Sequence, residues 1–126
     1  IISCATMSLS PILKGEWLKP GQHVDLIGAF RSDMREADDE VLRRGSLFVD
    51  ARATTIGHIG EIAIPIAEGT ITPDDILADF RNPSAFRRNS ESEITIFKNG
   101  GGAHLDLMVS RYILEVWNAR CSGGSS

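Results

Sequence analysis

The chain has 126 residues, of which 42% are hydrophobic, and a formal net charge of -4 at pH 7. This length suits one domain or part of one. The net negative charge and the dispersed Lys and Arg residues argue against binding to nucleic acid or to an anionic membrane surface. No apolar run is long enough to span a bilayer. Two cysteines make no disulfide framework and no signal peptide begins the chain, so we expect a cytoplasmic location.

The first half of the chain contains three strand-like segments. Residues 1–5 predict a short buried strand, and Ser10 before Pro11 predicts a helical turn, because Ser is a good cap and Pro suits the first helical position. Residues 23–29 and 47–50 predict the second and third strands. Strands and helices that alternate at this spacing favour parallel pairing, so we expect an α/β fold.

A helix is expected between the second and third strands. Asp33 is a good N-cap and Glu36 follows three residues later, which is the spacing of a capping box. Basic residues in the last turn and Gly45 after it are typical of a helix end. We therefore predict a helix from about Met34 to Arg44.

The second half is expected to hold two weaker helices, a fourth strand and one long helix. Residues 51–60 form a weak helix at best because they contain threonines and glycines, and residues 72–80 predict a short capped helix. Residues 94–97 predict the fourth strand. Residues 103–118 place apolar side chains at helical spacing, so this long helix needs a large partner surface. The tail, residues 121–126, is expected to be disordered.

The corner after the second strand is the expected centre of the chemistry. Gly28 and Ala29 lie at its tip, between a buried strand and the start of the predicted helix. In open α/β sheets, ligands bind at the carboxyl ends of the strands, and small residues let a ligand approach the backbone. We therefore expect the site to be built around residues 28–34.

Two other groups of residues have competing interpretations. Three glycines at residues 100–102 precede the long helix, where free N–H groups and Lys98 suit an anion, but glycines also simply permit a tight turn. Two His-x-Asp pairs begin at His23 and His104. Because no further ligand follows at a matching spacing, we expect no metal site.

Several stretches of the chain together resemble the ornithine cyclodeaminase/mu-crystallin family. They are the Gly-Glu-Trp-x-Lys-Pro-Gly run within residues 11–23, the Gly-Ala pair at 28–29, the Asp-Met-Arg-Glu run at 33–36, and residues 95–100. The resemblance continues to about Trp117. It implies a Rossmann domain, a separate substrate and dimerisation domain, NAD or NADP as cofactor, and a homodimer.

The resemblance also implies which residues bind which group. The cofactor-binding residues would be Ala5, Thr6, Gly28, Ala29, Met34 and Asn99, and the substrate would meet Phe30 and Gly100. Residues 1–99 would form the second half of a Rossmann-like domain. Residues 100–120 would be a helix that packs toward the substrate and dimerisation domain. The glycine-rich dinucleotide fingerprint and the substrate-carboxylate ligands would then lie in a missing N-terminal part of the same protein.

Phe30 is the main departure from the family pattern. Ornithine cyclodeaminases carry a catalytic Asp at this position, and a phenyl ring cannot accept a proton. We therefore expect the parent protein to reduce a cyclic imino acid or to oxidise a small amino acid, and expect this chain alone to be inactive. The alternatives are ornithine cyclisation to proline and ammonia, or a non-catalytic NAD(P)- or small-molecule-binding protein of the same fold.

Overall fold

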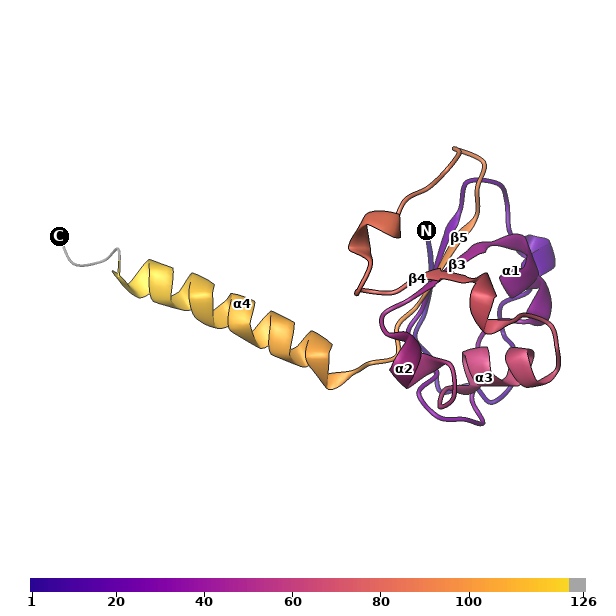
Figure 1. Cartoon of the computed structure of the whole chain (residues 1–126), viewed down its shortest axis with the longest axis horizontal. Helices are drawn as coiled ribbons and strands as arrows, with labels where there is room; N and C mark the ends of the chain where they lie inside the picture. Colours follow the sequence, from indigo (N-terminus) through magenta and orange to yellow (C-terminus); the bar gives the residue numbers. More distant parts are fainter. Residues whose placement is uncertain (123–126) are drawn as a thin grey trace.

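Five short strands, all parallel, form one sheet in a computed structural model that describes residues 1–122 (Figure 1). The sheet order is β1-β2-β5-β3-β4. The strands are β1 (Ile2–Cys4), β2 (His23–Leu26), β3 (Ser46–Val49), β4 (Ile76–Ala78) and β5 (Thr95–Lys98). The helices are α1 (Asp39–Arg44), α2 (Arg52–Thr55), α3 (Gly60–Ala67) and α4 (Ala103–Ser122). The predicted α/β fold with parallel strands and a long C-terminal helix is confirmed.

Alternation along the strands decides which face of the sheet becomes the core. Successive strand side chains point to opposite faces, and one face carries the fully buried Val24, Leu26 and Ile96. Val41 of α1 and Ile62 of α3 belong to the same hydrophobic cluster. The two helices therefore cover this face of the sheet, as Figure 1 shows.

The segment between β4 and β5 supplies aromatic side chains to the other face. Phe86 stacks on Phe48 of β3 with ring centroids 5.3 Å apart, and Phe80 stacks on Phe97 of β5 at 5.7 Å. This segment then leads into β5, which pairs between β2 and β3 although it is the last strand in the sequence. The insertion brings the end of β5 next to the corner after β2.

The helix predicted from Met34 begins later than expected, and Asp38 rather than Asp33 caps it. An Asp38 side-chain oxygen accepts hydrogen bonds from the backbone N–H of Val41 at 3.0 Å and of Gly15 at 2.9 Å. Asp33 instead forms an exposed ion pair with Arg31. The capping box predicted from Asp33 and its partner three residues later is therefore wrong.

Three other local predictions also differ from the structure. The helical turn expected at Ser10 is absent, and a 3₁₀ turn forms at Gly15–Trp17. The capping box at Thr72 is present, but its 3₁₀ turn ends at Asp75 because the next residues pair with β3 as β4. Of the weak helix expected over residues 51–60 only α2 forms, and α3, which begins at Gly60, was not predicted.

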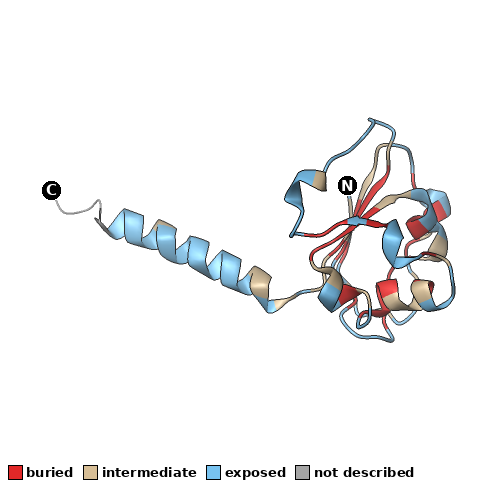
Figure 2. Cartoon of the chain, in the orientation of Figure 1, coloured by how far each residue is buried: buried red, intermediate tan, exposed pale blue. Residues whose placement is uncertain are grey.

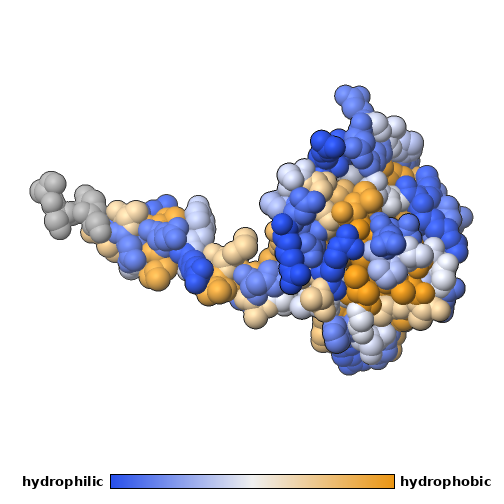
Figure 3. Space-filling model, in the orientation of Figure 1, coloured by the Kyte–Doolittle hydropathy of each residue, from blue (hydrophilic) through white to orange (hydrophobic). Residues whose placement is uncertain are grey.

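The long helix α4 projects from the body as an arm (Figure 1). Almost all of it is exposed (Figure 2), and orange apolar surface alternates with blue along it (Figure 3). Tyr112 and Trp117 are 66% and 65% exposed. The helix continues through Cys121 and Ser122, where a tail was expected, and residues 123–126 lie outside the described part. No helix within residues 1–122 has the length and apolarity to cross a membrane.

Candidate functional site

The carboxyl ends of the central strands meet along one edge of the sheet. The backbone N–H of Ile27 donates to the carbonyl of Cys4 at 2.8 Å, and that of Asn99 donates to the carbonyl of Leu26 at 3.0 Å. The loops after β1, β2 and β5 therefore lie side by side. Most of the residues predicted to bind cofactor or substrate are in these loops.

Gly28 sits where no side chain can be placed. A Cβ atom at this position would collide with the backbone N and O atoms of Thr6 and with an Oε1 atom of Glu36. The backbone of the second loop therefore lies directly against that of the first. This close approach explains the glycine in the corner without reference to its conformation.

A buried carboxylate, Glu36, joins these two loops. Its Oε1 atom accepts hydrogen bonds from the backbone N–H of Thr6 at 2.5 Å and from the Thr6 hydroxyl at 2.8 Å. Its Oε2 atom accepts the backbone N–H of Gly28 at 2.8 Å. Glu36 is fully buried, so these bonds form away from solvent, where losing one is costly. The carboxylate predicted to cap a helix instead holds the candidate site together.

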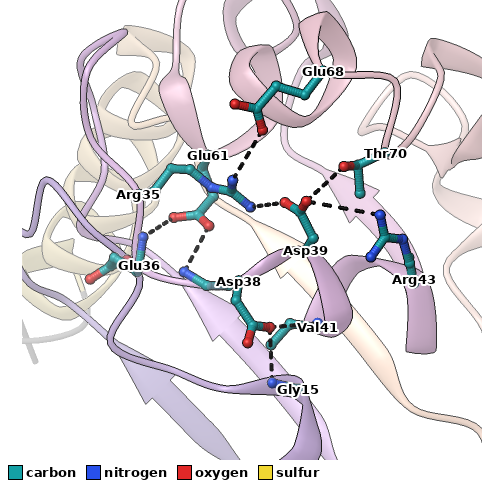
Figure 4. A network of polar contacts seen from close by, with 11 residues as sticks. Gly15, Arg35, Glu36, Asp38, Asp39, Val41, Arg43, Glu61, Glu68 and Thr70 are labelled. Atoms are coloured by element: carbon teal, nitrogen blue, oxygen red, sulfur yellow. Dashed lines mark hydrogen bonds and ion pairs between the residues drawn. The ribbon is translucent and has the colours of Figure 1, made fainter.

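A second buried carboxylate, Glu61 of α3, holds the backbone of Glu36 in turn (Figure 4). Its two oxygens accept the N–H groups of Glu36 at 2.6 Å and of Ala37 at 2.9 Å. Burial raises the pKa of Glu61, although these hydrogen bonds and the nearby cations Lys98 and Arg35 act in the opposite direction. Glu61 therefore links α3 to the chain that supports the corner.

Arg35 extends the same network toward the surface. Its guanidinium donates to Asp39 of α1 at 2.7 Å, and Asp39 also accepts a hydrogen bond from the hydroxyl of Thr70 at 2.8 Å. The hydrogen bond from Arg35 is the main cause that lowers the pKa of Asp39. The network in Figure 4 thus ties α1, α3 and the segment before β4 to the support of the site.

Lys98, the last residue of β5, is fully buried beneath the same edge. Its ammonium group donates to the carbonyl of Leu26 at 3.1 Å. Burial lowers the pKa of Lys98, and the carboxylates Glu61 and Glu36 oppose that shift. Lys98 is therefore part of the support under the corner rather than a free anion ligand beside the glycine run.

The remaining residues of the corner divide between the interior and the open edge. Ala29 and Met34 are each 1% exposed and pack with Ile59 in a small hydrophobic cluster. The Met34 side chain therefore supports the corner from inside. Phe30 is 56% exposed. Its ring stands at the open edge, where a substrate wall was expected.

The loop after β5 approaches the end of β3. A Cβ at Gly100 would lie 3.0 Å from Oδ1 of Asp50 and 3.1 Å from the hydroxyl oxygen of Thr55. Asn99 turns the chain by accepting the backbone N–H of Gly101 at 2.8 Å, and Gly101 has a φ of +69°, which favours glycine. Part of the glycine run is therefore explained by turn geometry.

Sequence reasoning missed Glu61 and Asp50 at this edge and gave Glu36 and Lys98 other roles. One signal was available. Lys98 follows Ile96 at a spacing of two, so it falls on the buried face of its strand. No such local signal marks Glu36 or Glu61, because Glu36 joins Gly28 to Thr6, which lies 30 residues away in the sequence, and Glu61 binds the backbone of Glu36, 25 residues away.

A separate hollow of about 230 Å³ lies on the aromatic face of the sheet. Its lining includes His23 and Thr95, which are the first residues of β2 and β5. Nδ1 of His23 is 2.8 Å from the Thr95 hydroxyl oxygen. This hollow therefore lies toward the amino ends of the strands, away from the edge that carries the predicted site.

Comparison with known proteins gives one family. A sequence model of the ornithine cyclodeaminase/mu-crystallin family matches residues 1–120. The chain is 59% identical over 119 residues to a Delta(1)-pyrroline-2-carboxylate reductase of Paracoccus denitrificans. This alignment covers 92% of this chain and 38% of that protein. The chain thus spans well under half the length of this relative.

Two solved structures resemble the fold. Delta(1)-pyrroline-2-carboxylate reductase of Thermococcus litoralis, in complex with NADH and L-proline, superposes with a TM-score of 0.74 at 34% identity, over 79% of this chain and 32% of that one. An archaeal alanine dehydrogenase dimer with bound NAD superposes with a TM-score of 0.81 at 32% identity, over 98% of this chain and 39% of that one. The second superposition includes most of α4.

Proposed function

Because this chain belongs to the ornithine cyclodeaminase/mu-crystallin family, we propose that it forms the second half of the Rossmann-like domain of an NAD(P)-dependent reductase of a cyclic imino acid. The identity of 59% to a pyrroline-2-carboxylate reductase is the observation that carries this proposal. A protein that binds NAD(P) or a small molecule without turnover remains the second candidate, since a fold does not fix a function.

The carboxyl edge of the sheet fits a dinucleotide. Gly28, Asn99 and Gly100 are partly exposed at the ends of β2 and β5, and Ala5 is exposed beside them. The cofactor-binding residues in this proposal are Ala5, Thr6, Gly28 and Asn99, with the buried Ala29 and Met34 beneath them. When bound, a reduced nicotinamide supplies the hydride. The residues of this chain would form part of the wall of the cofactor site and hold the loops at that edge in place.

The substrate in this proposal is a small cyclic imine with a carboxylate, rather than ornithine. Phe30 and Gly100 would face it. The exposed ring of Phe30 offers an apolar wall to the methylene groups of a five- or six-membered ring. It offers no carboxylate to orient the second ammonium group of ornithine. Groups that hold the substrate carboxylate would come from the remaining part of the protein.

The arm formed by α4 supports the proposal that residues 100–120 pack on another part of the protein. Its apolar residues are exposed along most of its length, and such surface normally marks an interface; they are Leu107, Met108, Val109, Tyr112, Ile113, Leu114 and Trp117. The superposition on the alanine dehydrogenase dimer covers 98% of the chain, so an arm of this kind occurs within a longer, dimeric protein. We propose that α4 contacts a substrate and dimerisation domain formed by sequence that precedes residue 1, and that the intact protein is a homodimer.

Cofactor titration tests whether the sequence upstream of residue 1 supplies most of the affinity for the cofactor. In a Rossmann domain, the pyrophosphate rests on the glycine-rich turn of the first half. We therefore expect residues 1–126 to bind NADH and NADPH weakly, and the protein extended upstream in its reading frame to bind one of them at least a hundredfold more tightly. Fluorescence titration measures both. Equal affinity of the two proteins for the cofactor would contradict the proposal.

A further inference from the structure

The end of β3 and the first turn of α4 bring together a buried carboxylate and an imidazole. Oδ2 of Asp50 lies 3.8 Å from Nε2 of His104. The Asp50 side chain is fully buried, and within residues 1–122 neither of these two atoms has a hydrogen-bond partner. The other Asp50 oxygen accepts the N–H of Ala51 at 2.8 Å and lies 3.2 Å from the Thr55 hydroxyl. One oxygen of Asp50 is thus fixed while the other faces the imidazole.

The surroundings hold the imidazole at the edge that carries the candidate site. The ring of Phe80 meets that of His104 edge-on, with centroids 6.4 Å apart. The His104 side chain remains 40% exposed. A Cβ at Gly102 would lie 2.5 Å from Nδ1 of His104. Glycine at this position therefore lets the imidazole ring pack against the backbone that begins α4.

We propose that His104 is the proton donor for imine reduction, and that Asp50 is the positioning residue that orients its imidazole. This inference rests on the proposed function and adds a residue with a stated role to it. Gly100, on the substrate side of the proposed site, approaches Asp50, so the pair lies next to the place assigned to the imine. A histidine within reach of a buried carboxylate is a common arrangement for proton transfer, and its hydrogen bonds are often long before substrate binds.

The step balances with the groups named. A reduced nicotinamide held along the edge formed by Ala5, Gly28 and Asn99 would supply the hydride to the imine carbon, and the C=N π electrons would move to nitrogen. That nitrogen takes the proton from the imidazole of His104, and the product is a cyclic amino acid. The neutral imidazole then regains a proton from solvent, to which its side chain is open.

The test compares variants of the upstream-extended protein with Delta(1)-pyrroline-2-carboxylate as substrate. We expect His104→Ala to lower kcat about a hundredfold, with a smaller change in KM, and to leave the Kd for the reduced cofactor within twofold. Added imidazole should restore part of the lost kcat. Asp50→Asn should lower kcat about tenfold. The matched control is His58→Ala, since His58 is an exposed histidine in the turn after α2.

A second measurement does not depend on activity. With ¹⁵N-labelled histidine, Asp50→Asn should move the ring-nitrogen resonances of His104 and leave those of His58 in place. A wild-type protein that reduces no cyclic imine would overturn the proposed function. A wild-type protein that does so, with His104→Ala equally active or not rescued by imidazole, would overturn this inference alone. Unmoved His104 resonances in Asp50→Asn would overturn the role of Asp50.

Discussion

Oε2 of Glu36 accepts the backbone N–H of Gly28 at 2.8 Å, and this bond fixes the end of β2 to a carboxylate that also holds the end of β1. The support of the candidate cofactor edge is therefore a buried carboxylate that binds backbone N–H groups, although the edge itself is made of glycine and alanine. Glu36 belongs to neither strand. It reaches the corner from the segment that leads into α1, so stability and cofactor affinity are coupled through one side chain.

Removing this carboxylate should affect both properties at once. Glu36→Ala leaves the N–H groups of Thr6 and Gly28 without their acceptor, so we expect a loss of about 3 kcal/mol in the free energy of unfolding. We also expect weaker cofactor binding in the upstream-extended protein. Glu40→Ala, at an exposed position of α1, is the matched control. Urea unfolding and fluorescence titration measure the two effects, and a Glu36→Ala protein that matches Glu40→Ala in both would contradict the role of Glu36.

Two glycine-to-alanine substitutions separate backbone approach from chain flexibility. At Gly28 a methyl group would collide with the backbone of Thr6, so we expect Gly28→Ala to unfold the corner and abolish cofactor binding. At Gly57 a Cβ would meet nothing within 4 Å, so Gly57→Ala should change stability by at most about 0.5 kcal/mol. Melting temperatures of the two variants decide the matter. Equal melting temperatures would refute the close approach at Gly28.

The cap of α1 gives a direct test of the corrected helix boundary. Asp38→Ala removes the acceptor of two backbone N–H groups and should cost about 1 kcal/mol of stability. Asp33→Ala removes only an exposed ion pair with Arg31 and should leave the unfolding midpoint unchanged. Denaturant unfolding of both variants provides the comparison. A larger loss of stability in Asp33→Ala than in Asp38→Ala would instead support a helix that begins after Asp33.

The burial of Lys98 predicts that the free energy of unfolding depends on pH with a definite sign. Because burial lowers its pKa in the folded protein, the unfolded chain binds more protons at this residue between that lowered value and the ordinary lysine pKa of about 10.4. Stability from this group therefore rises with pH across that window. We expect the free energy of unfolding of the wild type, relative to Lys98→Met, to increase from pH 7 to pH 10. A difference that falls over this range would contradict the burial of a lysine with a lowered pKa.

The parts of the fold that follow from local patterns were predictable from the sequence. Apolar strand patterns placed β2 and β5, and the corner at Gly28 and Ala29 was located as the end of a strand before a predicted helix, although a longer loop precedes α1 in the structure. The start of α1 was not, because Asp33 and Asp38 are both acceptable caps and only the contact of Asp38 with Gly15 selects between them. β4 was also missed because of a contact distant in the sequence. The capping box at Thr72 predicts a helix, but the residues that follow pair with β3 as a strand.

The candidate site was predictable only in its backbone. Small residues at strand ends mark where a ligand approaches, and family resemblance pointed to Thr6, Asn99 and Phe30. The buried carboxylates that support the edge depend on partners far away in the sequence, so no local pattern reveals them. The pairing of Asp50 with His104 likewise needs the topology that places the end of β5 beside β3.

The most direct test of the account is substrate turnover by the protein extended upstream in its reading frame. With NADH or NADPH, we expect it to reduce Delta(1)-pyrroline-2-carboxylate to proline, and with NAD and ornithine we expect no formation of proline and ammonia, because Phe30 supplies no carboxylate at the corner. Consumption of the reduced cofactor and chromatography of the amino-acid product measure both reactions. Imine reduction without ornithine cyclisation is the predicted result, and rapid proline formation from ornithine without imine reduction would contradict it.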